Sequence, residues 1–249
     1  DNVKDQYYDL EGNAYTGYRD GSNMYAIGHA IYTKNYRAFA GVDQQTGKAL
    51  YWKRHEFVDK ATGKPGFTLE TTDDYSEADY FIFDTSLPDL YGGFGTSLSW
   101  RGFDLSASFT YSIGGLTYDG GYAGYMAPPG GTVDSNFHED VFKAWTPENN
   151  TSDIPRFVYN DQNINGSSDR FLVPASYLNF QNAQIGYSFP ARMLAKAHIS
   201  RLRTYVTCDN IVYWSYRTGL DPRQSLSGST SAENYSPVRT ISFGINLTF

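Results

Sequence analysis

Ten residues near one end of the chain, Thr240 to Phe249, read TISFGINLTF and decide the fold class. Every second residue is apolar, and the residues between them are small or polar. Successive side chains of a β-strand point to opposite faces, so this pattern gathers all the apolar groups on one face. We therefore predict a strand whose apolar face holds Ile241, Phe243, Ile245, Leu247 and Phe249.

Two stretches farther upstream show the same period of two and read as a hairpin. Residues 94–100 and 103–111 alternate on either side of a short Arg101-Gly102 turn. Two alternating runs joined by two turn residues predict antiparallel strands that pair directly.

Two more strands are predicted between this hairpin and the final strand. Residues 177–189 change phase near Asn182, and one extra residue there, a β-bulge, would return the apolar groups to one face. Pro190 ends that stretch. Residues 201–210 again place Leu202, Thr204, Val206 and Cys208 opposite polar neighbours. Before residue 90, residues 24–42 and 49–58 read as extended, with breaks at 44–47 and 60–65.

Composition narrows the class of protein. The 249 residues include 22 Tyr, 16 Phe and 24 Gly, a balance that favours strands and turns over helices. No apolar run is long enough for a transmembrane helix. The net charge of -7 leaves no basic stripe for nucleic acid. We therefore predict an all-β protein that does not bind nucleic acid.

The connections between the predicted strands alternate in length. Residues 101–102 and 190–198 are short, whereas residues 114–176 and 211–238 are long and rich in Gly, Pro, Ser and Asn. Short turns on one side and long loops on the other are typical of an outer-membrane barrel, and strands of about ten residues suit a tilted bilayer crossing.

Seven blocks of sequence, in order, resemble one family, the SusC/RagA-like TonB-dependent outer-membrane transporters. They cover roughly residues 36 to 249. The blocks are AGVDQQTGKALY (40–51), LPDLYGGF (87–94) with WRGFDL (100–105), AWTPEN (144–149) with IPR (154–156), YLNFQN (177–182) with IGYSFP (185–190), RTYVTCDN (203–210), GLDP (219–222) and the final strand. Cys208, Asp209 and Gln181 depart from the residues usual in the family, and none of them disturbs the predicted strands.

The resemblance implies an all-β chain that supplies the C-terminal strands of a large antiparallel transmembrane β-barrel with long extracellular loops. On this interpretation residues 1–249 form one C-terminal portion, and the plug and the remaining strands lie outside the chain. Five predicted strands after residue 90 are too few to close a plugged barrel of about 22 strands. We therefore expect Asp1 to follow an internal cut in a longer transporter.

The resemblance also implies a function. The whole protein would import oligosaccharides or peptides across the outer membrane of a Gram-negative bacterium, with energy relayed by TonB. Its partners would be the rest of the same transporter, a SusD-like surface lipoprotein, TonB and the lipid bilayer. Loop composition does not distinguish a glycan from a peptide.

Catalytic motifs are missing from the sequence. It contains no G-x-S-x-G segment, and its four His residues have no zinc-binding spacing. We therefore expect no enzymatic activity.

One stretch has the spacing of a calcium loop. Residues 161–166 fit D-x-[DN]-x-[DN]-G, so the candidate ligands are Asp161, Asn163, Asn165 and Asp169. The twelfth position, which usually holds a bidentate Glu, is Leu172. Asn-Gly is also ordinary turn chemistry. Calcium and a plain turn are therefore both open, and no other cofactor is expected.

Aromatic side chains in the long connections are candidates for contact with ligand or with the lipoprotein lid, because loops often carry function. These are Tyr118, Tyr122, Tyr125 and Trp145, and Trp52 in the extended stretch 49–58 is a further candidate of the same kind. Trp100 and Tyr187 lie near strand ends and are predicted instead to anchor the sheet at a membrane interface.

A second class of protein fits the same pattern. A soluble secreted all-β carbohydrate-binding protein would also show period-two strands, since alternation does not tell a lipid face from the inner face of a sandwich. A closed eight-stranded barrel acting alone fits the length but not the seven family blocks.

Overall fold

The computed structural model describes residues 5–58, 60, 63, 65–129, 136–161, 163–164 and 166–249. The chain forms two compact units, each assembled from separate stretches of sequence. Unit 1 holds residues 1–87, 115–174 and 223–234, and unit 2 holds residues 88–114, 175–222 and 235–249. None of the helices in the described part of the chain combines the length and apolar character needed to cross a bilayer.

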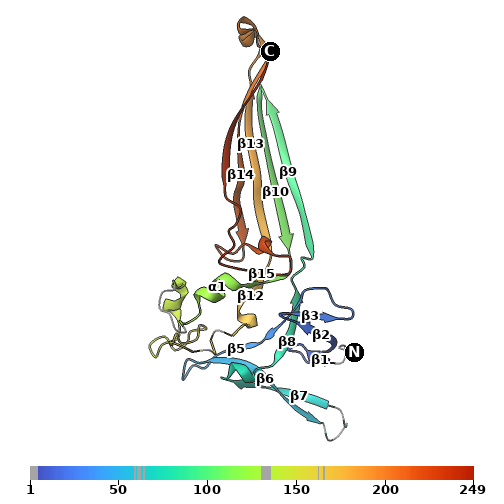
Figure 1. The fold of residues 1–249 in the computed structure, drawn as a ribbon, viewed down its shortest axis with the longest axis vertical. Helices are drawn as coiled ribbons and strands as arrows, with labels where there is room; N and C mark the ends of the chain where they lie inside the picture. Colours follow the sequence, from blue (N-terminus) through green and yellow to red (C-terminus); the bar gives the residue numbers. More distant parts are fainter. Residues whose placement is uncertain are drawn as a thin grey trace. The chain divides into compact units, whose positions relative to one another are not determined.

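Unit 2 is a five-stranded antiparallel sheet in the order β16-β14-β13-β10-β9. Its long strands run side by side in Figure 1. The strands are β9 (Leu90–Trp100), β10 (Phe103–Ile113), β13 (Tyr177–Ser188), β14 (Arg201–Ser215) and β16 (Thr240–Thr248). All five correspond to the alternating stretches of the sequence, which confirms that prediction. β14 extends five residues beyond its predicted end.

The predicted bulge lies one residue from its expected position. Phe180 and Asn182 of β13 pair with Phe109 and Ser108 of β10, so Gln181 is the extra residue. On the other side, Phe180 pairs with Val212 and Asn182 with Asp209. The bulge restores the phase of the strand, because Phe180 and Ala183 then share a face despite their odd spacing.

Short connections join these strands at one end of the sheet. Arg101 and Gly102 link β9 to β10 with φ of 48° and 91°. Positive φ at both central residues is the geometry that matches the twist of a two-residue hairpin. Residues 189–200 link β13 to β14 through α2 (Ala191–Leu194) and a 3-10 turn, η4 (Ala195–Ala197).

The described residues of unit 1 form three small sheets. A closed barrel is formed by β1 (Asp5–Tyr8), β2 (Ala14–Asp20), β3 (Asn23–Ala26), β4 (Thr33–Arg37) and β8 (Tyr80–Thr85). A second sheet holds β5 (Phe39–Val42), β6 (Ala49–Val58) and β7 (Pro65–Thr72). The third sheet holds β12 (Leu172–Pro174), β11 (Leu116–Asp119) and β15 (Ser229–Thr230).

Short helices complete unit 1. They are η1 (Tyr75–Glu77), α1 (Gly120–Tyr125), η2 (Glu139–Lys143) and η3 (Asp169–Phe171). Along the chain, η5 (Pro222–Gln224) begins with the last residue of a unit 2 stretch and continues into unit 1. The core of the second sheet is Ala49, Tyr51 and Ala78, with Phe39 and Tyr75 packed against them. Segments read from the sequence as long loops, residues 114–176 and 211–238, therefore contain much of unit 1.

The two-unit division is a feature that the sequence patterns do not show. Alternation reports only local strand geometry, and the chain passes between the units several times, so no single linker marks the division. The predicted extended stretches before residue 90 do form strands, with a turn at 43–48 between β5 and β6. Half of the break at 60–65, residues 61, 62 and 64, falls outside the described residues.

Candidate functional site

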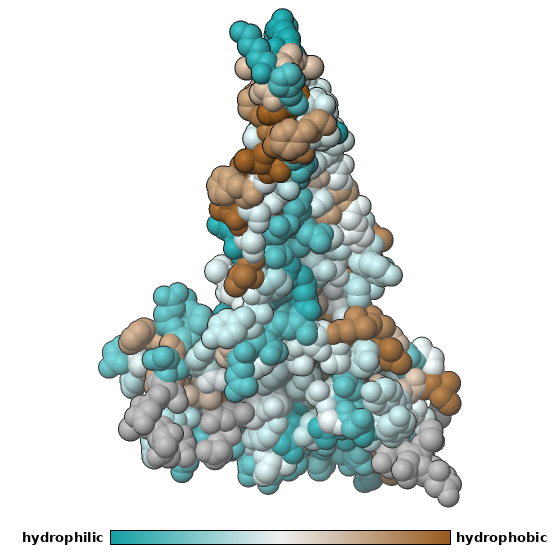
Figure 2. Space-filling view, turned by 45° about the horizontal axis from the view of Figure 1, so that its top comes forward, coloured by the Kyte–Doolittle hydropathy of each residue, from teal (hydrophilic) through white to brown (hydrophobic). Residues whose placement is uncertain are grey.

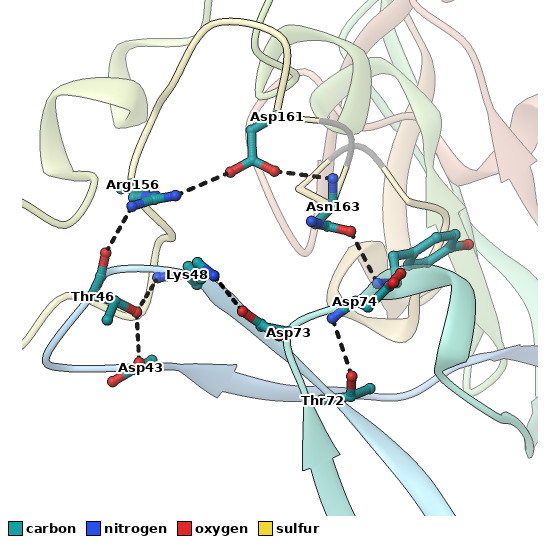
Figure 3. A network of polar contacts seen from close by, with 10 residues as sticks. Asp43, Thr46, Lys48, Thr72, Asp73, Asp74, Arg156, Asp161 and Asn163 are labelled. Carbon is teal, nitrogen blue, oxygen red and sulfur yellow. Dashed lines mark hydrogen bonds and ion pairs between the residues drawn. The ribbon is translucent and has the colours of Figure 1, made fainter.

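The candidate binding residues from the sequence all belong to unit 1, where a polar network joins the 43–48 turn to the segment around Asp161 (Figure 3). Asp43 accepts hydrogen bonds from Gln45 N at 2.9 Å and Thr46 Oγ1 at 2.5 Å. Arg156 Nη1 donates to the Thr46 carbonyl at 3.3 Å, and its Nη2 lies 3.9 Å from Asp161 Oδ2. One arginine therefore connects the turn to the predicted calcium loop.

The oxygens of that loop already have protein partners. Asp161 Oδ1 accepts from Asn163 N at 3.1 Å, and Asn163 Oδ1 accepts from Tyr75 N at 3.0 Å. Asp169 Oδ1 accepts from Phe39 N at 2.6 Å. The fourth predicted ligand, Asn165, lies outside the described residues. Calcium would have to compete with these bonds, so metal binding stays a prediction.

Asp169 carries a partly buried carboxyl. Burial raises its pKa to about 6, although backbone N–H groups of Phe39 and Arg170 oppose that change. The Asp169 carboxylate therefore stabilises the local backbone through its bond to Phe39 N, and it is also a possible calcium ligand.

Trp145 packs on the turn that the network holds. An ideal Cβ on Gly47, where φ is +72°, would lie 2.3 Å from Trp145 Cε3, so only glycine leaves room for the ring. The indole Nε1 donates to the Gln44 carbonyl at 3.3 Å. This Trp is thus half-buried against the 43–48 turn rather than presented freely to a ligand.

Trp52 lies in the middle of the second sheet. Its N–H donates to the Ala38 carbonyl at 2.9 Å, and its carbonyl accepts from Asp79 N at 3.1 Å. It pairs with Thr71 of β7 and its side chain is half-buried. Backbone hydrogen bonds therefore fix the position of Trp52 in the sheet, and part of its side chain is exposed to solvent.

The three candidate tyrosines have different surroundings. Tyr118 stacks on Tyr36, with ring centroids 5.1 Å apart, and burial raises the pKa of Tyr118 to about 12. The Tyr122 hydroxyl donates to Asp140 Oδ2 at 2.9 Å, and its ring lies 4.8 Å from His138. Tyr125 is 43% exposed. Tyr125 is therefore the most accessible of the three for a ligand.

The sequence reasoning missed the group at the centre of this aromatic region. The Arg170 guanidinium lies 5.0 Å from the Phe171 ring centroid and 5.4 Å from that of Phe39. Burial lowers the pKa of Arg170, and its Nη1 has no hydrogen-bond partner within the described part of the chain. No spacing signal marks this arginine, because Phe171 is its immediate neighbour in the chain whereas Phe39 comes from a distant segment.

Unit 2 presents a different surface, an apolar face that is open to the surroundings. Paired residues form a row across all five strands: Leu98, Leu105, Ile185, Val206 and Phe243. Phe243 is 81% exposed. Apolar side chains, in brown, gather along the strands of this unit in Figure 2. Contiguous exposed apolar surface of this kind marks an interaction with lipid or another apolar partner.

A second row on this face is aromatic. Phe94 stacks on Phe109 at 4.9 Å between centroids, and Phe109 stacks on Phe180 at 4.4 Å. The opposite face of the sheet is polar and carries an ion pair, Asp104 with Arg203.

Aromatic residues also end the apolar face beside the short connections. Phe103 lies 4.6 Å from Tyr187, and Tyr187 lies 5.0 Å from Phe189, between ring centroids. Trp100, which pairs with Phe103, is 66% exposed. The structure thus places Trp100 and Tyr187 at a strand end, the position from which aromatic residues anchor proteins at membrane interfaces.

The sequence of the chain is similar to those of known TonB-dependent receptors. No family model matches the chain. TonB-dependent receptor P3 of Formosa agariphila is 27% identical over 191 residues, which are 73% of this chain and 18% of the relative. TonB-dependent receptor P26 of the same organism is 26% identical over 215 residues, 80% of this chain and 21% of the relative.

Comparison with solved structures also finds transporters. The RagAB peptide transporter matches with a TM-score of 0.72 and 25% identity, over 98% of this chain and 25% of the matched chain. The RagAB peptide importer in its closed-closed state matches with a TM-score of 0.74 and 24% identity, over 95% and 26% of the two chains. The chain spans about a fifth of the length of the curated relatives it matches.

The strands of unit 2 therefore have the fold of barrel strands in TonB-dependent transporters. Within that class, the chain is similar to one part of a SusC/RagA-like TonB-dependent receptor.

Proposed function

We propose that this chain supplies barrel wall and outward-facing segments to an outer-membrane importer of a Gram-negative bacterium. The importer takes up oligosaccharides or peptides with energy relayed by TonB, and it works with a SusD-like surface lipoprotein. The chain acts in transport rather than catalysis. The observation that carries the proposal is the exposed apolar face of unit 2, because a sheet with such a face is stable where lipid covers it.

The length of the strands supports a bilayer crossing. β9 and β10 have 11 residues each, and β13 has 12. A tilted transmembrane strand needs about 9–11 residues. In outer-membrane barrels the short turns face the periplasm. We therefore orient the end with Trp100 and Tyr187 toward the periplasm.

The sheet also requires further strands. Within the described residues, β9 pairs only with β10, and β16 pairs only with β14. An open strand edge in lipid leaves backbone groups unsatisfied at a cost of several kcal/mol each. We infer that other strands of the same transporter cover both edges.

The polar segments of unit 1 are the proposed region of ligand and lid contact. Tyr125 and Trp52 are the candidates with accessible ring surface, whereas Tyr118, Tyr122 and Trp145 position their neighbours through packing. The matched RagAB structures are those of a peptide transporter. This similarity supports peptides as one of the two proposed substrate classes.

The test uses cells that produce the full-length receptor and cells that lack it. Mixtures of peptides and of oligosaccharides are supplied, and their loss from the medium is followed by mass spectrometry, with and without a protonophore. Uptake that needs both the receptor and the proton gradient supports the proposal. Equal uptake by the two strains contradicts it.

Two further measurements address the partner and the contact residues. Affinity purification of the tagged receptor should recover a surface lipoprotein in stoichiometric amount. Tyr125→Ala should weaken uptake, whereas Tyr18→Ala, which removes a tyrosine of similar exposure (46%) outside the candidate set, should not. Equal effects of the two substitutions would remove Tyr125 from the contact region.

A further inference from the structure

A groove of about 400 Å³ lies within unit 2 at the far end of β14 from the short connections. The last pair between β14 and β16 is Asp209 with Thr240, and from there to Ser215 β14 is paired with β13 but not with β16. The groove follows this segment. Its lining includes Tyr213, Trp214, Ser215, Arg217, Pro237 and Arg239.

The charge of the groove is positive. Of the described residues that line it, Arg217 and Arg239 are cationic and none carries a carboxylate. Arg239 is exposed, and its Nε donates to the Ile211 carbonyl at 2.9 Å. That bond fixes the guanidinium beside β14 and uses one of its five N–H donors. A fixed, exposed guanidinium is well suited to an anion with several acceptor oxygens.

The groove also adjoins the apolar face. Trp214 pairs with Leu178 and Val212 with Phe180, so both belong to the face that carries Phe109 and Phe243. Trp214 is 52% exposed. A tryptophan beside an arginine at the end of an apolar strand face is the arrangement found where a protein meets lipid headgroups.

We propose that this groove binds the phosphate group of an anionic lipid, with Arg239 as its principal cation and Trp214 at headgroup depth. The inference rests on the proposed function, which places this end of the sheet at the outer surface of the membrane. A nutrient in the lumen would instead meet the polar face of the sheet, on which Asp104 and Arg203 lie. A lipid phosphate reaches the groove from the apolar side.

The test uses the full-length receptor in phosphatidylcholine nanodiscs that contain either diphosphorylated lipid A or its dephosphorylated form. Native mass spectrometry counts the lipid A molecules retained after extraction. One arginine near a membrane surface contributes about fivefold to the affinity for an anionic lipid. Arg239→Gln should therefore reduce retention of the phosphorylated form by about that factor and leave the dephosphorylated form unchanged.

The matched control is Arg101→Gln. Arg101 lies 5.0 Å from the Trp100 ring at the opposite end of the sheet, so it is also an arginine beside an exposed tryptophan. Retention in this variant should equal that of the wild type. Three outcomes overturn the inference: equal loss in both variants, equal retention of both forms of lipid A, or displacement of lipid A by millimolar inorganic phosphate, which marks a site for small anions.

Uptake measured on the same variants separates this inference from the proposed function. Phosphate-dependent retention of lipid A with no uptake of peptide or oligosaccharide contradicts only the proposed substrates. Normal uptake without such retention contradicts only the lipid site. A receptor that does not insert into the nanodisc contradicts both.

Discussion

Asp104 and Arg203 form a two-pronged ion pair across the strand that separates them. Arg203 Nε donates to Asp104 Oδ1 at 3.0 Å, and Nη2 donates to Oδ2. Asp104 lies on β10 and Arg203 on β14, so the pair crosses β13 at Gly186. An ideal Cβ on Gly186 would lie 2.6 Å from Arg203 Nη2 and 2.7 Å from Asp104 Oδ1. The absence of a side chain on Gly186 therefore makes the bridge possible.

Gly186→Val should destabilise the sheet more than Arg203→Ala does. Arg203→Ala loses one partly exposed ion pair, which contributes about 1 kcal/mol or less to the free energy of unfolding. Gly186→Val displaces both charged side chains and also crowds the neighbouring strands. The measurement is the temperature at which the folded band of the full-length receptor is lost on a gel without boiling. Gly124→Ala is the control, because no atom lies within 4 Å of its ideal Cβ. Equal temperatures for Gly186→Val and wild type would contradict the steric role.

Phe243→Lys should prevent or weaken membrane assembly, whereas Ser242→Lys should be tolerated. The two neighbours lie on opposite faces of β16, and Phe243 is on the exposed apolar one. A lysine facing lipid near the middle of the bilayer costs about 2–4 kcal/mol, and one facing the lumen costs little. The amount of receptor recovered in the outer membrane measures the difference. Equal recovery, with both variants stable in the absence of detergent, would favour the soluble carbohydrate-binding alternative.

Gly47→Ala should loosen the 43–48 turn and the Trp145 loop packed on it. A non-glycine residue held at positive φ costs about 1–3 kcal/mol, and here the new methyl group also meets the Trp145 ring. Gly21→Ala separates the two effects, since Gly21 has φ of +58° with open space around it. Limited proteolysis of residues 144–161 should be faster in Gly47→Ala than in Gly21→Ala. Identical rates would show that the ring contact adds nothing to the backbone strain.

The segment around Asp169 should be more stable at pH 4 than at pH 7. Burial raises the pKa of this carboxyl from 3.8 to about 6, so the folded state holds the proton more tightly than the unfolded state. Stability therefore falls as the pH rises from about 4 to about 6, by at most about 3 kcal/mol at about 1.4 kcal/mol for each pH unit. Hydrogen exchange of residues 166–174, measured across this range, reports the change.

Asp169→Asn should abolish that pH dependence, because the amide can still accept the Phe39 N–H without carrying a charge. The same substitution tests the calcium hypothesis, in which Asp169 is a ligand. If calcium protects the wild-type segment from exchange at pH 7 and not the variant, metal binding gains support. If calcium changes neither, the loop is a turn held by protein hydrogen bonds.

The long strands of unit 2 could be predicted because their information is local. In TISFGINLTF and in residues 103–111, each side chain reports its own face, and the two-residue period survives without knowledge of any partner. Even the bulge was visible as a change of phase, one residue from its position at Gln181.

The candidate site was less predictable, because its contacts join distant segments. Tyr118 and Tyr122 read as loop aromatics, yet Tyr118 stacks on Tyr36, and Tyr122 bonds to Asp140. The calcium spacing of residues 161–169 is a linear pattern, whereas the real partners of its oxygens include Tyr75 and Phe39. Arg170 had no pattern at all, since the Phe39 ring reaches it only on folding.

The sequence by itself determined which faces of the strands are apolar, where the tight turns fall and which family the chain resembles, because strand alternation and turn chemistry depend on neighbours in the chain. Tertiary structure alone decided that residues 115–174 and 223–234 join the first 87 residues in a separate unit. It also decided that the Asp104–Arg203 ion pair passes over Gly186. Those features depend on contacts between residues far apart in the chain. Such contacts leave no local period for a single sequence to display.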